Sequence, residues 1–532
     1  VKEEKIMKKV LGLGLAMTMG VSLLAGCGGS ADAPAKDSTP TAGAASETAI
    51  STGEDTEAAA ANPENEEFVT LELYAVTMGG NNDSLPAVNE KLNDYLKDKI
   101  NAEVHLNIIS MGSYGQQVNL MMSSTEQVDL MMSTGALTTM LSAQGALTPL
   151  DQLLPEYGQG IVDTMGMDVI NACMYNGEVF AVPTNRDLAR SLGFFYRKDF
   201  NEQYELGLEN VTNLEELEAS FAKLKEANPD LTPVSSGVSD LGMELYNEAW
   251  DDLGQNGTDY GALENYGEEL TVVNKYTSDA YKEMINMAYD WYGKGYIYNE
   301  TDTTTTSGVD LFKTNKYLGF FANWNPSSNN AQSQAMGTDM GFVQLLEPMM
   351  STATIQSATW TIPHNAKYPE RAMQFLNLMY TDPTVFNLLA FGVEGENYVI
   401  VDEEKGIIDY PEGMDATTKT YDNTLDWMWG NMMIGYTWNG NDPELHEQMT
   451  AFNNSARKSK ALGFVWDSSN VENQMTACSN VASRYVKGLQ CGKLDPSTLD
   501  EFNKELEAAG INDIIADKQE QLDAWAQANG VQ

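Results

Sequence analysis

The segment FVTLELYAVTMGGNNDSLPAVNEKLNDYLKDKI, residues 68–100, decides the fold of this chain. Residues 68–76 are rich in β-branched and aromatic side chains and predict a strand. A glycine and asparagine turn follows at 79–83. Apolar residues then recur at helical spacing: Leu85, Val88, Leu92, Leu96 and Ile100. This spacing predicts a helix, and a strand followed at once by an amphipathic helix is the building unit of an α/β fold.

The next stretch repeats this unit. Val104, Leu106 and Ile108 alternate with polar residues, as in a half-buried strand. Residues 114–123 predict a helix, and residues 128–132 predict a short buried strand. Alternating strands and helices predict a parallel sheet with right-handed crossovers, in which ligands bind beyond the carboxyl ends of the strands. Those ends are expected at residues 79–83, 111–114 and 133–136.

The N-terminus has the features of an export signal. Two lysines precede an apolar run of sixteen residues, 10–25, which is shorter than the roughly 20 that a membrane-spanning helix needs. Residues 1–26 therefore predict a signal peptide. The following LAGC, residues 24–27, resembles the lipobox of bacterial lipoproteins. That resemblance implies a diacylglycerol on the Cys27 thiol, which would anchor the mature protein to a membrane.

Composition separates a tether from a folded body. Residues 27–67 consist mainly of small, polar and acidic residues and predict a disordered acidic tether. From residue 68 onward the chain is rich in apolar residues and long enough for two or more lobes. The whole chain has 31 basic and 77 acidic residues, a net charge of -46. Such a chain repels phosphate backbones, so we exclude nucleic acid as a partner.

Few residues suggest metal or redox chemistry. A helix over 478–491 would hold the sulfurs of Cys478 and Cys491 roughly 20 Å apart, beyond disulfide reach, and we expect these cysteines and Cys173 to be buried as small apolar residues. The three histidines lack the spacing of metal ligands. We expect no metal and no cofactor.

A surface glycoside hydrolase remains an alternative, but it needs two carboxylates flanking a glycosidic bond, and the many acidic residues single out no pair.

Four later stretches occur in the order of one family's landmarks. They are YNGEVFAVPTNRDLARSLGFFYRKDF (175–200), the segment 293–324, SATWTIPHNAKYPERAMQFLNLMYTDPTVFNLLAFGVEGENY (357–398) and ALGFVWDSSNVENQMTACSNVASRYVKGLQCGKLD (461–495). Together they resemble bacterial extracellular solute-binding proteins of the family 1 type, which serve ABC importers. The last stretch resembles the C-terminal extension, of the DUF3502 type, found in a Gram-positive lipoprotein branch of that family.

The resemblance implies a two-lobe α/β fold of the type II periplasmic-binding-protein class, with hinge-linked lobes and the ligand in the inter-lobe cleft. It places residues 68–186 and 337–384 in the first lobe. Residues 187–336 and 385–532, with the C-terminal extension, fall in the second lobe. The implied protein is not an enzyme: it is anchored by lipid to the extracellular face of the cytoplasmic membrane. There it passes a small solute to the transmembrane subunits of an ABC permease.

Aromatic residues favour a carbohydrate, most simply an oligosaccharide, because sugar rings pack C–H faces on flat side chains. Trp324 follows the apolar strand 317–321, where the resemblance to maltodextrin-type binding proteins places a sugar-stacking aromatic, although it could instead fix the hinge. Trp360 could line the cleft or the core. Trp427 and Trp429, two apart, would share one face of an extended segment, and core packing is an alternative for either.

Polar candidates lie at the expected lobe edges. Asn185 and Arg186 lie at the crossing into the second lobe, where Arg186 could pair with Asp187 or hold ligand oxygens. Tyr114 follows the second strand, and Asp83 either lines the cleft or only shapes a turn. A receptor of the same fold for peptides or another organic nutrient remains the alternative function.

Overall fold

The computed structural model describes residues 67–235, 250–253, 260–300, 306, 308–422 and 425–531. The predicted signal peptide, Cys27 and all of the tether but Glu67 lie outside these residues. The first lobe is built on a five-stranded sheet of order β2-β1-β3-β12-β6. Its strands are β1 (Val69–Thr77), β2 (Ala102–Ser110), β3 (Leu130–Ser133), β12 (Thr359–Thr361) and β6 (Val182–Pro183). β1 is parallel to β2 and β3, and β12 is antiparallel to β3 and β6, so the predicted parallel sheet is confirmed for its first three strands.

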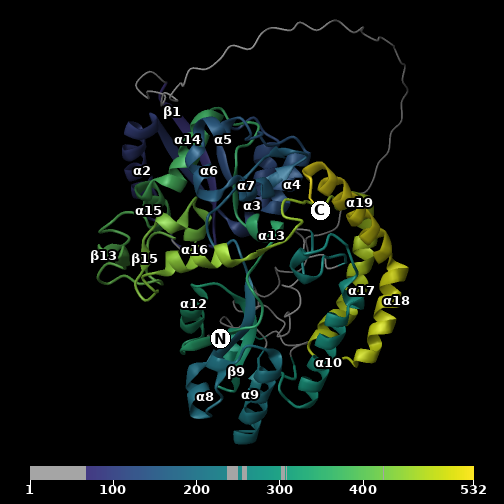
Figure 1. Ribbon diagram of the computed structural model, residues 1–532. Helices are drawn as coiled ribbons and strands as arrows, with labels where there is room; N and C mark the ends of the chain where they lie inside the picture. The colour runs from purple at the N-terminus through teal and green to yellow at the C-terminus, as the bar shows by residue number, and fades with distance from the viewer. Residues whose placement is uncertain are drawn as a thin grey trace, which may run out of the picture. The chain divides into compact units, whose positions relative to one another are not determined.

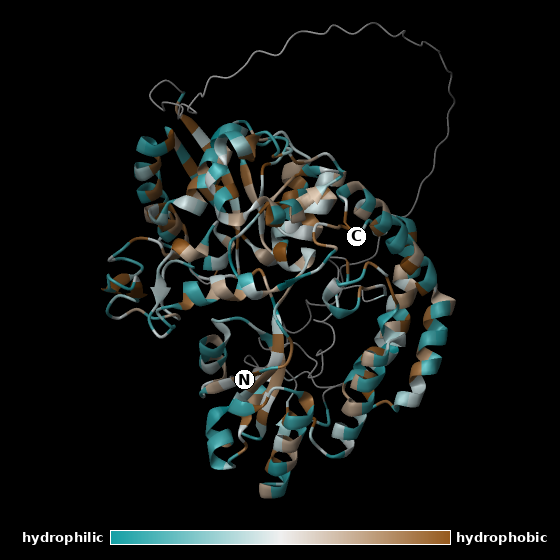
Figure 2. Ribbon diagram, in the orientation of Figure 1, coloured by the Kyte–Doolittle hydropathy of each residue, from teal (hydrophilic) through white to brown (hydrophobic). Residues whose placement is uncertain are grey.

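Helix α2 (Leu85–Ile100) forms as its spacing predicts. Pro86 stands in its first turn, where its missing N–H costs nothing, and Asn101 ends it in the left-handed conformation. Leu92 and Leu96 are fully buried against the sheet. The next helix, α3 (Met111–Met122), begins three residues earlier than the predicted 114–123. In Figure 2, apolar residues gather on the strands and polar residues line the outer faces of the helices.

The second lobe is built on a four-stranded sheet of order β10-β7-β9-β8. Its strands are β10 (Met340–Gln344), β7 (Ser191–Arg197), β9 (Tyr317–Trp324) and β8 (Thr232–Val234). Every residue of β7 is buried, and β7 is antiparallel to both β9 and β10. A Cβ at Gly193 would lie 2.0 Å from the carbonyl oxygen of Val343, so only glycine fits there.

The predicted lobe boundaries are wrong in two places. Strand β10, predicted in the first lobe, pairs with β7 in the second. Residues 385–438, predicted in the second lobe, pack into the first: Phe386, Leu389 and Trp429 share the core of β1. The chain crosses between lobes inside short segments, and no change of composition marks those points.

The C-terminal extension shares a core with residues 260–285, separate from the core of the second sheet. Its helices are α17 (Glu472–Gln490), α18 (Leu499–Ala509) and α19 (Ile511–Asn529). α17 packs against both α18 and the earlier helix α10 (Asp279–Gly293), as Figure 1 shows. Tyr276, Tyr281 and Phe502 lie at the centre of this core. Cys478 and Cys491 are buried as predicted, and Cys173 is buried in the first lobe.

The remaining elements cover the sheets or connect them. In the first lobe and its edges these are α4 (Gly135–Ala143), α5 (Leu153–Tyr157), α6 (Gln159–Met165), α7 (Met167–Ile170), β4 (Met174–Tyr175), β5 (Glu178–Val179), α13 (Thr352–Ile355), α14 (Pro369–Thr381), α15 (Pro383–Phe391), β13 (Val399–Asp402), β14 (Ile407–Asp409) and β15 (Thr437–Trp438). In the second lobe they are α8 (Lys198–Gln203), α9 (Leu214–Ala227), α11 (Gly308–Phe312) and α12 (Ser328–Met336). The other elements are α16 (Leu445–Ser455) and the paired strands β11 (Met349–Met350) and β16 (Arg457–Lys458). Within the described ranges, none of the helices combines the length and apolarity that crossing a bilayer requires.

Candidate functional site at the lobe junction

Residues 184–190 carry the chain from β6 of the first lobe to β7 of the second. Asn185 is pinned to the first lobe, since its backbone N–H donates to Gly430 O at 2.8 Å and its side chain donates to Asn431 Oδ1 at 2.9 Å. Asn453 on α16 accepts from the N–H of Leu188 at 2.9 Å and donates to the carbonyl oxygen of Arg186 at 2.6 Å. Side-chain amides on both sides therefore hold this crossing in place.

Five residues from both lobes meet at the crossing, and we call them the crossover cluster: Arg186, Asp187, Asn325, Asp426 and Trp427. The Arg186 guanidinium carbon lies 4.4 Å from the centroid of the Trp427 ring, and its Nε donates to Asp187. Asn325, directly after β9, donates to Asp187 Oδ2 at 2.8 Å. The Arg186 and Asp187 side chains each remain 20% exposed. The cluster therefore presents charged groups beside a partly exposed indole.

The charges of the crossover cluster are nearly balanced. Burial raises the pKa of the Asp426 carboxyl, whereas the nearby positive charge of Arg186 lowers it. Asp187 is neutralised by its ion pair with Arg186. Guanidinium, carboxylate and amide groups beside an aromatic ring can hydrogen-bond hydroxyls and stack on an apolar face. This chemistry suits a neutral, hydroxyl-rich ligand.

Trp324 is the last residue of β9, not a residue of the loop after it, which corrects the predicted position. Its ring stacks on Phe342 with centroids 5.3 Å apart and meets the edge of Phe452 on α16 at 5.5 Å. Its Nε1 donates to Asn329 at 3.2 Å. These contacts favour the alternative role, an aromatic that fixes the hinge, although the side chain is only partly buried.

Trp360, Trp429 and Tyr114 lie in the core of the first lobe, which favours the core alternative for the two tryptophans and corrects Tyr114 as a ligand contact. Trp360 is 0% exposed and stacks on the buried Trp429 with centroids 5.5 Å apart. Tyr114 is buried, and its hydroxyl donates to Met132 O at 2.6 Å. Trp427 and Trp429 do not share a face, because η6 (Asp426–Met428) is a helical turn rather than an extended segment.

Asp83 is exposed and lies outside the crossover cluster. Its backbone N–H donates to Asn81 Oδ1 at 2.9 Å, which is the geometry of a local turn. Arg186 pairs with Asp187, which is one of the two alternatives predicted for it. Of the predicted residues, the structure therefore brings together Asn185, Arg186 and Trp427.

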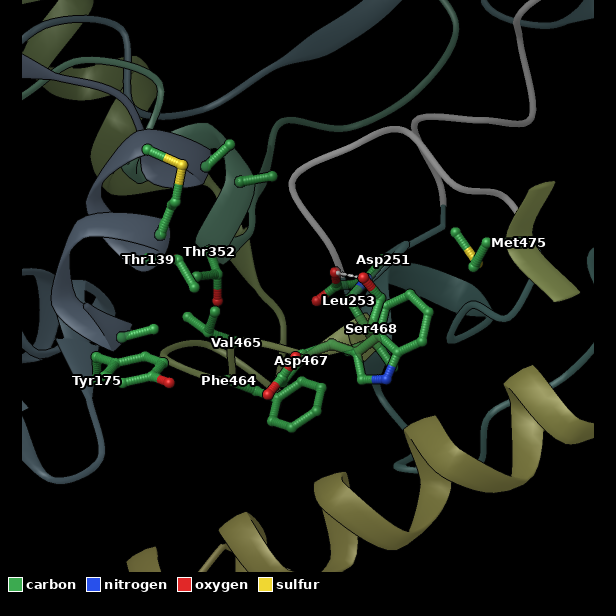
Figure 3. Close-up of a pocket in the computed structure, with 15 residues that line it drawn as sticks. Thr139, Tyr175, Asp251, Leu253, Thr352, Phe464, Val465, Asp467, Ser468 and Met475 are labelled. Atoms are coloured by element: carbon green, nitrogen blue, oxygen red, sulfur yellow. Dashed lines mark hydrogen bonds between the residues drawn. The ribbon is translucent and has the colours of Figure 1, made fainter. Parts of the chain in front are cut away.

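The structure also contains a cavity that was not predicted from the sequence, and we call it the α4 pocket. It is a cavity of about 260 Å³, partly open to solvent, between α4 and Tyr175 of the first lobe and two later segments, 251–253 and 464–468. Figure 3 shows Thr139 and Tyr175 on one side of it and Asp251 and Leu253 on the other. These residues are far apart in the sequence, although Ala136, at one of the strand ends predicted to bind ligand, also lines the pocket.

Comparison with known proteins places the chain in a family. The family model described as "bacterial extracellular solute-binding protein" matches residues 92–391, more than half of the chain. The chain belongs to this family. The C-terminal extension of this solute-binding protein, residues 460–527, matches a domain of unknown function, DUF3502, as predicted.

Relatives of this solute-binding protein include a carbohydrate ABC transporter substrate-binding protein of Streptococcus pneumoniae serotype 4, 24% identical over 465 residues, covering 86% of this chain and 90% of that one. The crystal structure of an N-glycan transport solute-binding protein, NgtS, of S. pneumoniae has 23% identity and a TM-score of 0.75, covering 86% and 99% of the two chains. The same protein with Man5GlcNAc has a TM-score of 0.62, at the same coverage.

An extracellular solute-binding protein of Bifidobacterium longum subsp. infantis is 15% identical with a TM-score of 0.58, covering 85% and 98% of the two chains. These likenesses confirm the predicted two-lobe α/β fold of the type II class. Because the family is extracellular, the predicted extracellular location of this protein is also confirmed.

Proposed function

We propose that this protein captures an oligosaccharide outside the cell and delivers it to the transmembrane subunits of an ABC importer. The observation that carries the proposal is the crossover cluster, where the Trp427 ring and the Arg186–Asp187 pair meet Asn325 from the other lobe. A sugar ring offers a C–H face for the indole and hydroxyls for the planar polar groups. The described functions of the relatives, a carbohydrate transporter component and an N-glycan receptor, support the same ligand class.

Binding at this cluster would couple to movement of the lobes. Trp427 belongs to the first lobe and Asn325 to the second, while Arg186 lies on the crossing between them. A ligand that contacts both lobes binds the closed arrangement better than the open one and shifts the population toward closure. The permease would then recognise the closed, loaded receptor.

The polar groups favour a neutral ligand over a peptide. A peptide carboxylate would compete with Asp187 for Arg186, which is already paired and neutralised. A hydroxyl-rich ligand instead adds hydrogen bonds without displacing the ion pair. Arg186 and Asp187 therefore act as a fixed ion pair with no net charge.

A thermal melting panel tests the ligand class. Purified protein is heated with N-glycan oligosaccharides, beginning with Man5GlcNAc, with maltodextrins, and with oligopeptides. A ligand at 100 times its dissociation constant adds about 2.7 kcal/mol of stability, so a saccharide should raise the melting temperature. Stabilisation by peptides alone would replace this proposal with the peptide receptor. Release of shorter sugars, abolished by changing one carboxylate, would establish a hydrolase instead.

Cys27→Ala tests the proposed lipid anchor. The thiol of Cys27 is the only acyl attachment point that the LAGC stretch offers, and stable anchoring requires such a chain. We expect the variant to appear in the medium or to remain unprocessed, whereas the unchanged protein sediments with membranes. Cell fractionation with antibody detection measures this, and a processed variant that still sediments with membranes would contradict the anchor.

A further inference from the structure

Asp251 in the α4 pocket has a carboxylate oxygen that the fold leaves unused. The residue is only 5% exposed, and its Oδ1 accepts the N–H of Leu253 at 3.0 Å. Its Oδ2 is buried and has no hydrogen-bond partner among the described residues. Buried polar atoms are almost always paired, and an unpaired one costs about 1–3 kcal/mol. An acceptor kept in this state inside a pocket is suited to a ligand's donor.

The aromatic wall of the α4 pocket is held rigidly. Trp466 lines the pocket, and its Nε1 donates to Asp517 Oδ2 at 2.8 Å. The Lys518 ammonium lies 4.4 Å from the centroid of the Trp466 ring and also donates to Gly261 O at 2.7 Å. These contacts come from α19, so the C-terminal extension fixes the indole before any ligand arrives. A wall ordered in advance loses little conformational entropy on binding.

The charges around Asp251 indicate a neutral donor rather than a cation. Burial raises the pKa of the Asp251 carboxyl, whereas the nearby Ser459 side chain, the Leu253 N–H and the positive charge of Lys518 lower it. Lys518 thus already supplies a counter-charge at this wall of the pocket. What Oδ2 still lacks is a hydrogen bond, which a hydroxyl group can donate.

The first lobe supplies the opposite wall. Thr139 of α4 and Tyr175 of β4 line the pocket, and Figure 3 shows the Tyr175 hydroxyl pointing toward its interior. Phe464 adds a second aromatic side chain from the extension. An acceptor, hydroxyls and a fixed indole thus surround one cavity, and they come from two separate parts of the fold.

We propose that the α4 pocket is a subsite for one sugar ring of the bound oligosaccharide. A ring hydroxyl donates to Asp251 Oδ2, and the C–H face of the ring packs on Trp466. The C-terminal extension, a domain of unknown function, would then have a role in ligand recognition. This inference rests on the proposed carbohydrate function and extends it to a second surface.

Asp251→Asn tests the subsite. The amide has the size of the carboxylate and leaves an oxygen for the Leu253 N–H, but an NH₂ group replaces the free acceptor. A hydrogen bond to a charged group contributes about 1.5–3 kcal/mol, so the affinity should fall by roughly 10- to 150-fold, at 1.4 kcal/mol for each factor of ten. Calorimetric titration with Man5GlcNAc, or with the most stabilising saccharide of the panel, measures this change.

Asp523→Asn is the matched control, since it makes the same change at an exposed position of α19 and should leave the affinity unchanged. Tyr175→Phe removes one hydroxyl from the opposite wall and should weaken binding a few-fold, which keeps the test open if Asp251→Asn folds poorly. Unchanged affinity in both pocket variants would overturn the subsite and leave the proposed function intact. Failure of the unchanged protein to bind any saccharide would instead overturn the proposed function.

Discussion

Replacing Trp360 with alanine is expected to lower the free energy of unfolding by about 3–5 kcal/mol. The side chain is fully buried, stacks on Trp429, and donates from Nε1 to Met428 O at 2.7 Å. Alanine leaves a cavity in the centre of the first lobe and an unpaired carbonyl oxygen. Urea unfolding followed by far-ultraviolet circular dichroism measures the loss.

Trp427→Ala is the matched control for Trp360→Ala. Its side chain is only partly buried and lies against Arg186, so its removal should cost roughly 1 kcal/mol of stability. It should instead weaken saccharide binding by about 1.5–3 kcal/mol, the scale of one large apolar side chain against a partner. A stable Trp360→Ala protein with impaired binding would return Trp360 to the ligand site.

Replacing Lys518 with methionine is expected to cost about 3–5 kcal/mol of stability, because removing one partner of a buried charged network leaves the others uncompensated. Lys518 is fully buried and donates to the carbonyl oxygens of Asp252 at 2.9 Å and Gly261 at 2.7 Å. Methionine fills the same volume but cannot donate. The loss should be concentrated where α19 meets residues 250–263.

Urea unfolding measures the total change, and amide hydrogen exchange locates it. Lys504→Met makes the same substitution on the exposed face of α18 and should change stability by less than about 0.5 kcal/mol. Equal effects of the two substitutions would show that Lys518 does not hold the extension in place.

The first strand and helix of the first lobe could be predicted from residue types and from the spacing of apolar residues. The strand at β1 and the helix at α2 were predicted to within a residue or so, the strand from its β-branched and aromatic residues and the helix from the spacing of its apolar face. The start of α3 was placed late, since Met111 and Gly112 carry no periodic signal. The spacing of apolar residues indicates which face of a helix or strand is buried, but it locates the ends of the element poorly.

Lobe membership and burial depth could not be predicted in the same way. β10 joins the second sheet through pairing with β7, a contact between residues far apart in sequence. Trp427 and Trp429 are only two residues apart in the sequence, yet Trp429 is in the core and Trp427 lies at the crossing. Tertiary packing alone distinguishes them.

The candidate site was predicted in part. Asn185 and Arg186 were recognised from their place before the strand at β7, and the structure pins both to the crossing. The α4 pocket was not recognised, because Tyr175, Asp251 and Trp466 come together only when the extension docks on the first lobe. Its sequence signals were the strand end predicted at residues 133–136, whose Ala136 lines the pocket, and the resemblance of residues 461–495 to a family extension, which names no ligand contact.

Isothermal titration calorimetry of the purified protein with Man5GlcNAc, related oligosaccharides and oligopeptides of similar mass is the most direct test of oligosaccharide capture. Mass spectrometry of the recovered ligand completes the measurement. We predict saturable one-to-one binding of at least one oligosaccharide, recovery of that sugar intact, and no heat from the peptides. Saturable binding of a peptide with no response to any saccharide, or recovery of a cleaved sugar, would contradict it.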